Sequence, residues 1–424
     1  MKKYARYKDS GISWIGDVPE HWNYYPFYAL FEQKSQCGFC DEELLSVYLD
    51  KGVIRFSDAG EKRANATSED LSKYQLVEEG DFVLNNQQAW RGSVGVSFFR
   101  GIVSPAYVIL KMSEKLERTF ANYLLRNRSM VAMYCLASKG VGSIQRNLVW
   151  NKVKRSAIFI PPLPEQKAIA EYLDKKTAQI NELVSAKQKQ IELLKEYKQS
   201  VIANAVTGKL DERTGSRPTD ERREKINWIG YIPRHWLKRK FQYLFKERSE
   251  KNHPEEPVLC ATQSRGVIPQ SMYENRVVVV NTGFEGLKFV KKGDFVISLR
   301  SFQGGIEYAY YQGIISAAYT ILYINTKDLY SDYVRLLFKS VPFIGLLQTC
   351  VTGIREGQNI NNDLLRKQII PIPPLSEQKE IVAYIEKKVS SIDSQIASIE
   401  NQIANLNEYK QSLISDVVTG KVKV

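Results

Sequence analysis

The chain contains few of the residues on which most enzyme chemistry depends. Its 424 residues include only three histidines and five cysteines, and an odd number of scattered cysteines does not form a disulfide framework. Cys37 and Cys40 have a C-x-x-C spacing, but a structural zinc site needs two further ligands at comparable spacing, and none is present. His21, His235 and His253 leave little for acid–base catalysis.

Long hydrophobic runs are also missing. No stretch approaches the roughly 20 consecutive apolar residues that are needed to cross a bilayer. Residues 1–6 are basic, but no apolar run follows them, so they do not have the form of a secretory signal. We therefore expect a cytoplasmic protein that has no membrane partner.

The sequence lacks the motifs of a DNA-translocating motor and of an adenine methyltransferase. It has no G-x-x-x-x-G-K-[ST] phosphate loop and no Asn-Pro-Pro or Asp-Pro-Pro segment to hold a flipped adenine. Residues 165–167 and 377–379, both EQK, match the acid-x-Lys tripeptide of many nucleases. That tripeptide is frequent by chance, and an acid in the first turn of a helix has a structural explanation. No catalytic residue and no metal ligand is predicted.

The chain carries a formal net charge of +13, and the excess is not evenly distributed. Residues 1–160 carry +5 and residues 226–372 carry +7, whereas residues 161–225 carry +2 and residues 373–424 carry −1. Positive charge concentrated in two separate segments favours a polyanionic partner such as nucleic acid. The alternative is that mild basicity serves solubility alone.

The chain consists of two tandem repeats of one sequence pattern. Five matches occur in the same order at an offset of 212 to 214 residues, which indicates tandem duplication of a whole unit. The paired segments are 14–22 and 228–236 (WIGDVPEHW and WIGYIPRHW), 80–83 and 293–296 (GDFV), 101–107 and 313–319, 161–167 and 373–379 (PPLPEQK and PPLSEQK), and 196–209 and 408–421 (both starting EYKQS and ending VTGK).

The first part of each repeat, residues 1–160 and 226–372, mixes strand and helix patterns. Residues 81–84 and 277–280 are typical of strands bounded by Gly and Asn. Residues 116–136 and 332–347 have helical patterns, although Pro342 weakens the second of these. Residues 210–225, between the repeats, are polar and rich in helix breakers, and are predicted to form an exposed linker.

The second part of each repeat, residues 161–209 and 373–424, is predicted to be a long helix. Glu165 and Glu377 open the helices, where a carboxylate complements the helix dipole, and Ser376 is a candidate N-cap. Neither Pro nor Gly interrupts the pattern until Gly208 and Gly420. Some 42 residues would form a rod of about 60 Å.

Apolar residues recur in these helices at heptad spacing, which is typical of a coiled coil. The bland alternative is a helix that packs only on its own domain. Two equal helices in one chain pack most simply against each other, through seam residues Leu173, Ile180, Val184, Ile191, Leu194 and Val201 of the first helix and Ile385, Val389, Ile392, Ile396, Ile399, Ile403, Leu406 and Leu413 of the second.

These patterns predict an α/β (α+β) fold with an internal pseudo-two-fold repeat. Two mixed α/β domains are expected at opposite ends of two long antiparallel coiled-coil helices. Two DNA-contacting domains held at a fixed separation would suit a bipartite DNA target. The half-sites of such targets lie about one helical turn, ~34–36 Å, or a multiple of it apart. Since the compact parts differ while the helices are nearly alike, the two half-sites are expected to differ.

The repeated order of variable domain, P-P-L-x-E-Q-x-x-I, long helix and V-T-G-K resembles the specificity subunits of type I restriction–modification enzymes, over essentially the whole chain. The resemblance implies a non-catalytic subunit with two target recognition domains. It also implies two adenine-N6 methyltransferase partners docked on the helices, with restriction subunits joining the complex. No cofactor is expected in this chain, and S-adenosylmethionine is expected in the methyltransferase partners.

Base-reading residues are predicted in two loops of each repeat, because Arg, Asn, Gln and Ser on exposed loops read base edges. Ordinary turn chemistry, with Asn147 or Asn359 capping a short helix, is an equally good interpretation of any single residue. The candidates are Asn86, Gln87, Gln88, Arg91, Ser143, Gln145, Arg146, Asn147, Arg300, Ser301, Gln303, Arg355, Gln358 and Asn359.

A rival hypothesis is a coiled-coil scaffold that joins two protein-binding domains and has no DNA role. A steep loss of DNA affinity with added salt favours the reader over the scaffold.

Overall fold

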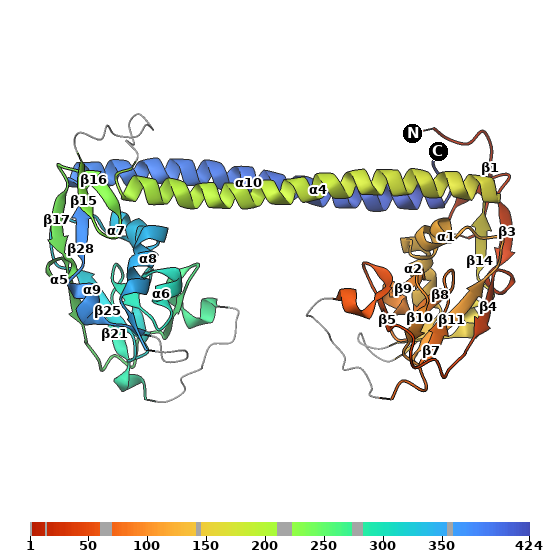
Figure 1. Ribbon diagram of the computed structural model, residues 1–424, viewed down its shortest axis with the longest axis horizontal. Helices are drawn as coiled ribbons and strands as arrows, with labels where there is room; N and C mark the ends of the chain where they lie inside the picture. The colour runs from red at the N-terminus through yellow and green to blue at the C-terminus, as the bar shows by residue number, and fades with distance from the viewer. Residues whose placement is uncertain are drawn as a thin grey trace. The chain divides into compact units, whose positions relative to one another are not determined.

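The computed structural model describes residues 2–12, 15–59, 70–140, 146–209, 223–273, 283–353 and 359–424 (Figure 1). It divides into two compact units. Unit 1 is Met1–Lys187 with Asn401–Val424, and unit 2 is Gln188–Glu400. Each unit therefore combines one region of strands and short helices with parts of both long helices, α4 (Leu163–Val206) and α10 (Leu375–Val418).

The core of unit 1 is a four-stranded antiparallel sheet in the order β4-β11-β8-β9. Its strands are β4 (Phe31–Lys34), β11 (Tyr107–Met112), β8 (Phe82–Asn85) and β9 (Val94–Val96). Phe82, Val83 and Leu84 of β8 are fully buried, because apolar side chains cover both faces of this strand. One face joins the main core with Phe27 and Phe31, and the other joins a smaller core around Val47 and Val103.

Two-stranded antiparallel pairs and short helices complete unit 1. The pairs are β1 (Tyr7–Asp9) with β2 (Asp17–Pro19), β3 (Asn23–Pro26) with β14 (Ala157–Ile160), β5 (Leu45–Tyr48) with β6 (Gly52–Arg55), β7 (Gln75–Val77) with β10 (Gly101–Val103), and β12 (Ser138–Lys139) with β13 (Asn147–Leu148). The helices are α1 (Arg118–Leu125), α2 (Arg128–Leu136), α3 (Trp150–Val153) and the 3₁₀ turns η1 (Phe27–Ala29), η2 (Phe56–Ala59) and η3 (Ala89–Arg91).

Unit 2 repeats this topology. Its central sheet has the order β18-β25-β22-β23, with β18 (Phe245–Arg248), β25 (Thr320–Ile324), β22 (Phe295–Ile297) and β23 (Glu307–Tyr308). The pairs are β15 (Arg223–Ile226) with β16 (Gly230–Pro233), β17 (Leu237–Lys240) with β28 (Ile369–Ile372), β19 (Leu259–Thr262) with β20 (Gly266–Pro269), β21 (Lys288–Val290) with β24 (Gly313–Ile315), and β26 (Val351–Thr352) with β27 (Asn359–Ile360). The helices are α5 (Phe241–Leu244), α6 (Ser301–Gly304), α7 (Ser331–Phe338), α8 (Val341–Thr349), α9 (Asn362–Arg366), η5 (Gln270–Met272) and η6 (Phe284–Gly286).

Two predicted helices are each divided in the structure. Residues 116–136 form α1 and α2, because the Asn127 side chain accepts a hydrogen bond from the Ser129 N–H and so starts a new helix. Residues 332–347 form α7 and α8, and Pro342 lies in the first turn of α8, where a missing N–H has no cost. The predicted strand at 277–280 lies outside the described residues.

The long helices have 44 residues each, or about 66 Å at 1.5 Å per residue. Both end at a glycine in the left-handed region, Gly208 with φ of 67° and Gly420 with φ of 76°. Ser376 lies inside the first turn of α10, so it is not the N-cap that the sequence suggested.

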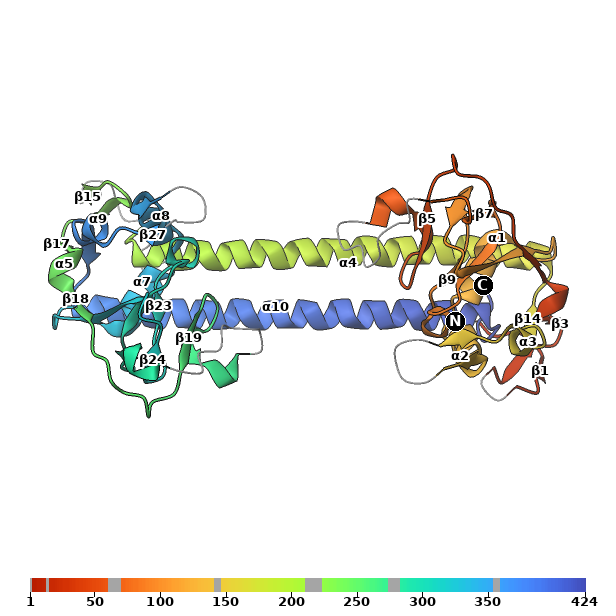
Figure 2. The same cartoon turned by 90° about the horizontal axis from the view of Figure 1, so that it is seen from below.

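The two helices pack antiparallel within each unit (Figure 2). In unit 1 the Lys187 ammonium donates to Gln402 at 2.5 Å, and Lys410 donates to Asn181 at 2.9 Å, so one residue number rises as the other falls. In unit 2 Lys198 donates to both carboxylate oxygens of Asp393, at 2.7 and 2.8 Å. All fourteen predicted seam residues are buried or half-buried. The predicted fold class is confirmed.

Candidate DNA interface

The motif that opens each repeat holds the acid that opens each long helix. In unit 1 the Glu165 carboxylate accepts hydrogen bonds from the Tyr4 hydroxyl at 2.6 Å and from Trp22 Nε1 at 3.2 Å. Its other oxygen lies 2.7 Å from His21 Nε2. Burial and the hydrogen bond to Glu165 raise the pKa of Tyr4 well above its usual value, so Tyr4 stays a donor.

We call this set of contacts between the opening motif and the first-turn glutamate the helix clamp. Unit 2 has the same helix clamp. Trp236 Nε1 donates to one oxygen of Glu377 at 2.8 Å, and His235 Nε2 lies 2.7 Å from the other. The acid of each acid-x-Lys tripeptide is therefore engaged by aromatic and imidazole donors of its own unit. The hydrogen bonds of Glu165 and Glu377 therefore fit a structural role at the start of each helix, as the first-turn interpretation of the tripeptides predicts.

The glutamine that follows each acid is fully buried and fixes the helix to the strand region. Gln166 accepts from the Glu117 N–H at 2.8 Å and donates to the carbonyls of Lys115 and Pro161, both at 2.9 Å. Gln378 makes the same three kinds of bond, with Tyr330, Asp328 and Pro373. Both N–H donors and the carbonyl oxygen of each amide have hydrogen-bond partners, so the side chain can be buried completely.

The V-T-G-K ends are exchanged between the repeats. Gly208, which ends α4, lies against Pro233 and Trp236 in unit 2, where a Cβ at Gly208 would come 2.5 Å from Pro233 Cδ. Gly420, which ends α10, lies against Pro19 and Trp22 in unit 1. Each tryptophan thus contacts the start of its own repeat's helix and the end of the other repeat's helix. Glycine is required here for its positive φ and for this close approach.

The two predicted reading loops of unit 1 meet. Asn86 accepts a hydrogen bond from the Leu148 N–H at 3.1 Å, so Asn86 joins the loop after β8 to the β12–β13 hairpin. The Arg146 guanidinium stacks over the Trp90 ring at 4.9 Å. Asn86, Gln88 and Arg146 are half-buried, whereas Gln87, Arg91 and Asn147 are exposed. Asn86 therefore has a structural role, and the exposed side chains are the ones that solvent or a partner can reach.

The predicted loops of unit 2 are also neighbours, since α6 contacts β27. Arg300, Gln303 and Asn359 are exposed, but Ser301 is 1% exposed and its hydroxyl accepts from the Ser298 N–H at 2.8 Å. Ser301 fixes the turn that presents its neighbours. Neither Asn147 nor Asn359 caps a helix: both lie in hairpin strands, and Asn361 caps α9.

Four of the candidates, Ser143, Gln145, Arg355 and Gln358, lie outside the described residues. Among the residues that are described, Cys37 and Cys40 are free and exposed, and no group of His, Cys, Asp and Glu could hold a metal ion.

Sequence reasoning missed a cation that supports the unit 2 loops. Lys339 donates to Glu307 at 2.5 Å and to the carbonyls of Gly304 in α6 and Gln263, at 2.9 and 3.1 Å. Glu307 is 2% exposed, and this burial raises its pKa to about 7 against the opposing effect of Lys339. The repeat offset could have pointed to this position, because Arg126 and Lys339 are the C-caps of the equivalent helices α1 and α7.

Comparison with known proteins decides the family. Residues 19–193 and 238–408 each match the model of the type I restriction modification DNA specificity domain. This chain belongs to that family. Because the two matches fall one in each repeat, membership confirms both the duplication and the predicted relation to specificity subunits.

Curated members of the specificity family are distant relatives of this chain. It is 25% identical to the type I restriction enzyme EcoKI specificity subunit of Escherichia coli K12 over 284 residues, 62% of this chain and 57% of that protein. The match thus spans little more than half of that relative. It is 23% identical to the putative type I restriction enzyme MjaX specificity subunit of Methanocaldococcus jannaschii over 375 residues, 84% of this chain and 81% of that protein.

Solved structures share the fold of this specificity-family chain. A structure described as the basis of complex assembly and conformational transition of the type I R-M system has a TM-score of 0.64 at 15% identity, over 96% of this chain and 99% of that chain. The HsdS subunit from Thermoanaerobacter tengcongensis has a TM-score of 0.52 at 16% identity, over 96% of this chain and 98% of that chain.

No helix within the described ranges is long and apolar enough to cross a membrane.

Proposed function

We propose that this chain is the sequence reader of a type I restriction–modification system and that each strand region reads one half of an asymmetric, bipartite DNA site. One observation carries the proposal. The two units have the same topology and the same helix clamps, yet their candidate reading loops carry different exposed side chains. A common support with unlike loops is what an asymmetric target requires.

The proposed organisation follows the repeat. Target recognition domains occupy residues 1–160 and 226–372, spacer helices occupy residues 161–209 and 373–424, and a linker occupies residues 210–225. The spacer helices hold the two readers at a set separation, because two 44-residue helices packed along a seam are far stiffer than a linker. A fixed separation defines the number of unread base pairs.

The proposed partners are those that the resemblance to specificity subunits implies. The proposed complex contains double-stranded DNA, two adenine-N6 methyltransferase subunits that bind S-adenosylmethionine and dock on the helices, and restriction subunits that join through the complex. It acts in the cytoplasm, where the host DNA lies. This chain contributes recognition and positioning but no chemical step.

A domain exchange tests the proposal. Residues 226–372 are replaced by the equivalent segment of a relative with a known target, and methylated adenines are mapped across the DNA of a host that carries the partner subunits. One half-site should change and the other should stay. A change in both halves contradicts the modular reader, and the absence of a steep loss of DNA affinity with added salt in the wild-type complex favours the scaffold hypothesis.

A further inference from the structure

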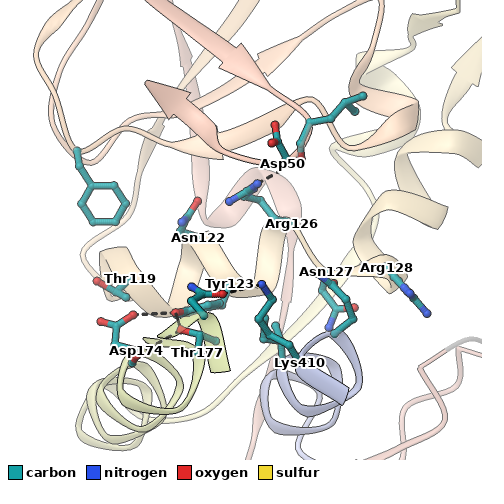
Figure 3. A pocket seen from close by; sticks show the side chains of 15 residues that line it. Asp50, Thr119, Asn122, Tyr123, Arg126, Asn127, Arg128, Asp174, Thr177 and Lys410 are labelled. Atoms are coloured by element: carbon teal, nitrogen blue, oxygen red, sulfur yellow. Dashed lines mark hydrogen bonds between the residues drawn. The ribbon is translucent and has the colours of Figure 1, made fainter. Parts of the chain in front are cut away.

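Unit 1 contains a polar cavity of about 700 Å³ between its strand region and the two long helices. Figure 3 shows the lining side chains, with Arg126, Asn127 and Arg128 on the strand-region side and Lys410 on α10. Asp50 and Asp174 also line it, so three cations face two carboxylates. The Asp174 carboxylate is engaged by the Tyr123 hydroxyl at 2.8 Å.

Of the two cations on the strand-region side, Arg126 is the half-buried one, and it lacks a close carboxylate among the described residues. Its guanidinium packs against Gly52, where a Cβ would lie 3.4 Å away, and it donates to the Leu49 carbonyl at 3.3 Å. Within the described residues no carboxylate lies within ion-pair distance of it. Burial lowers the pKa of Arg126, with Asp50 acting in the opposite direction, so a charged guanidinium here lacks a close counter-charge.

Unit 2 shows what compensation looks like at the equivalent position. Lys339 occupies the place of Arg126 and donates to the Gln263 carbonyl, as Arg126 does to that of Leu49. Lys339 also has the buried carboxylate of Glu307. Strand register places Gly95 where unit 2 has Glu307, because Val83 pairs with Gly95 as Val296 pairs with Glu307. Unit 1 thus keeps the cation and lacks the internal anion.

A second observation also points to an acceptor from outside the chain. Asn127 lines the cavity and is 4% exposed, and its Nδ2 donor has no hydrogen-bond partner. Its Oδ1 accepts from the Ser129 N–H at the start of α2. A buried donor without a partner costs free energy in the unliganded protein, and an anion beside Arg126 and Arg128 is a suitable acceptor.

We propose that this cavity binds one phosphate of the DNA backbone, with Arg126, Arg128 and Lys410 as its cationic donors. This inference rests on the proposed function. The net lining charge of +1 matches a single phosphate, and Arg, Lys and amide donors are the usual phosphate contacts. The cavity lies at the first residues of α2, and the same helix packs against η3 of the reading loop, where Val131 contacts Gly92. A phosphate held here fixes the register of that loop.

The test measures how duplex affinity depends on salt in the complete complex with its methyltransferase subunits. Arg126→Gln should lower the slope of log affinity against log salt by about 0.9, the value for one phosphate contact on B-DNA. Affinities for the cognate and an unrelated duplex should fall by the same factor, because a phosphate contact carries no sequence information. Arg126→Lys should restore the slope, which a merely structural role for Arg126 does not predict.

The matched control is an exposed cation of the same unit that does not line the cavity. Lys175→Gln on α4 removes one positive charge outside the cavity and should leave the slope unchanged. An unchanged slope in Arg126→Gln overturns the phosphate site while leaving the reader intact. Loss of methyltransferase subunits from Arg126→Gln without a change in slope also overturns it, in favour of an acidic protein segment. Absence of salt-dependent binding in the wild-type complex instead overturns the proposed function itself.

Discussion

Trp236 donates its indole N–H to Glu377 at 2.8 Å, so the motif that opens the second repeat holds the first turn of α10. The two residues are 141 positions apart in the chain. Trp236 is 3% exposed, so its indole N–H depends on a partner within the protein. The bond explains why the two motifs occur together in both repeats.

Replacing Glu377 by Ala should destabilise the protein, because the Trp236 donor is left buried without a partner. A loss of about 1–3 kcal/mol in the free energy of unfolding is expected for such a group. Urea unfolding of the full chain measures it. Glu400 lies exposed on the same helix, so Glu400→Ala is the matched control and should change stability by no more than about 0.5 kcal/mol. Equal losses in both variants would show that the clamp contributes nothing particular.

The seam between the long helices should depend on apolar burial more than on its ion pairs. Ile392 is 3% exposed, and Ile392→Ala should cost about 2–5 kcal/mol. Lys198 forms an exposed pair with Asp393, and Lys198→Ala should cost under about 1 kcal/mol. Thermal unfolding of both variants at low and high salt separates the contribution of apolar burial from that of the ion pair. A larger effect for Lys198 contradicts this ranking.

Glu307 should make unit 2 less stable as the pH rises from about 5 to 7. Its pKa is raised to about 7 in the folded chain, from an ordinary value near 4.5, chiefly by burial. Between these values the folded state binds more protons than the unfolded state, so stability falls with rising pH and then levels above pH 7. Unfolding measured from pH 4.5 to 8 should show this fall in the wild type. Glu307→Gln should flatten it, and an equal slope in the variant contradicts the assignment.

Arg300 and its neighbour Ser301 should behave differently although both were predicted to read bases. Arg300 is exposed, and an Arg that contacts a base edge contributes about 1–3 kcal/mol of discrimination. Arg300→Ala should therefore reduce affinity for the cognate duplex more than for duplexes altered in that half-site. Ser301 is buried against Ser298, so Ser301→Ala should lower stability and affect all duplexes alike. Binding to a panel of single-base-pair variants distinguishes them.

The long helices and the duplication could be predicted because both are written in local patterns. Heptad spacing identifies the seam from Ile385 to Leu413, and a nearly constant offset identifies the repeat. The clamp could not be predicted, since nothing in sequence spacing joins His21 to Glu165. The exchange of Gly208 and Gly420 between the repeats could not be predicted for the same reason.

The reading loops were only partly predictable from residue type. Asn86 and Ser301 have the chemistry of base readers, but in the folded chain they bond to the N–H groups of Leu148 and Ser298. A polar side chain in a turn serves either purpose, and only the surrounding backbone decides between them. Arg126 and Lys339 were overlooked because each follows a helix with no local sign of a special role.

The central claim is that α4 and α10 set the distance between two DNA readers. Its most direct test inserts seven residues between Lys187 and Gln188 and seven between Asn401 and Gln402, next to a contact that joins the helices. Each insertion adds about 10 Å of helix, which corresponds to about three base pairs of duplex. Mapping of methylated adenines should show both half-sites unchanged and separated by about three more unread base pairs. An unchanged spacer with intact methylation would contradict the account.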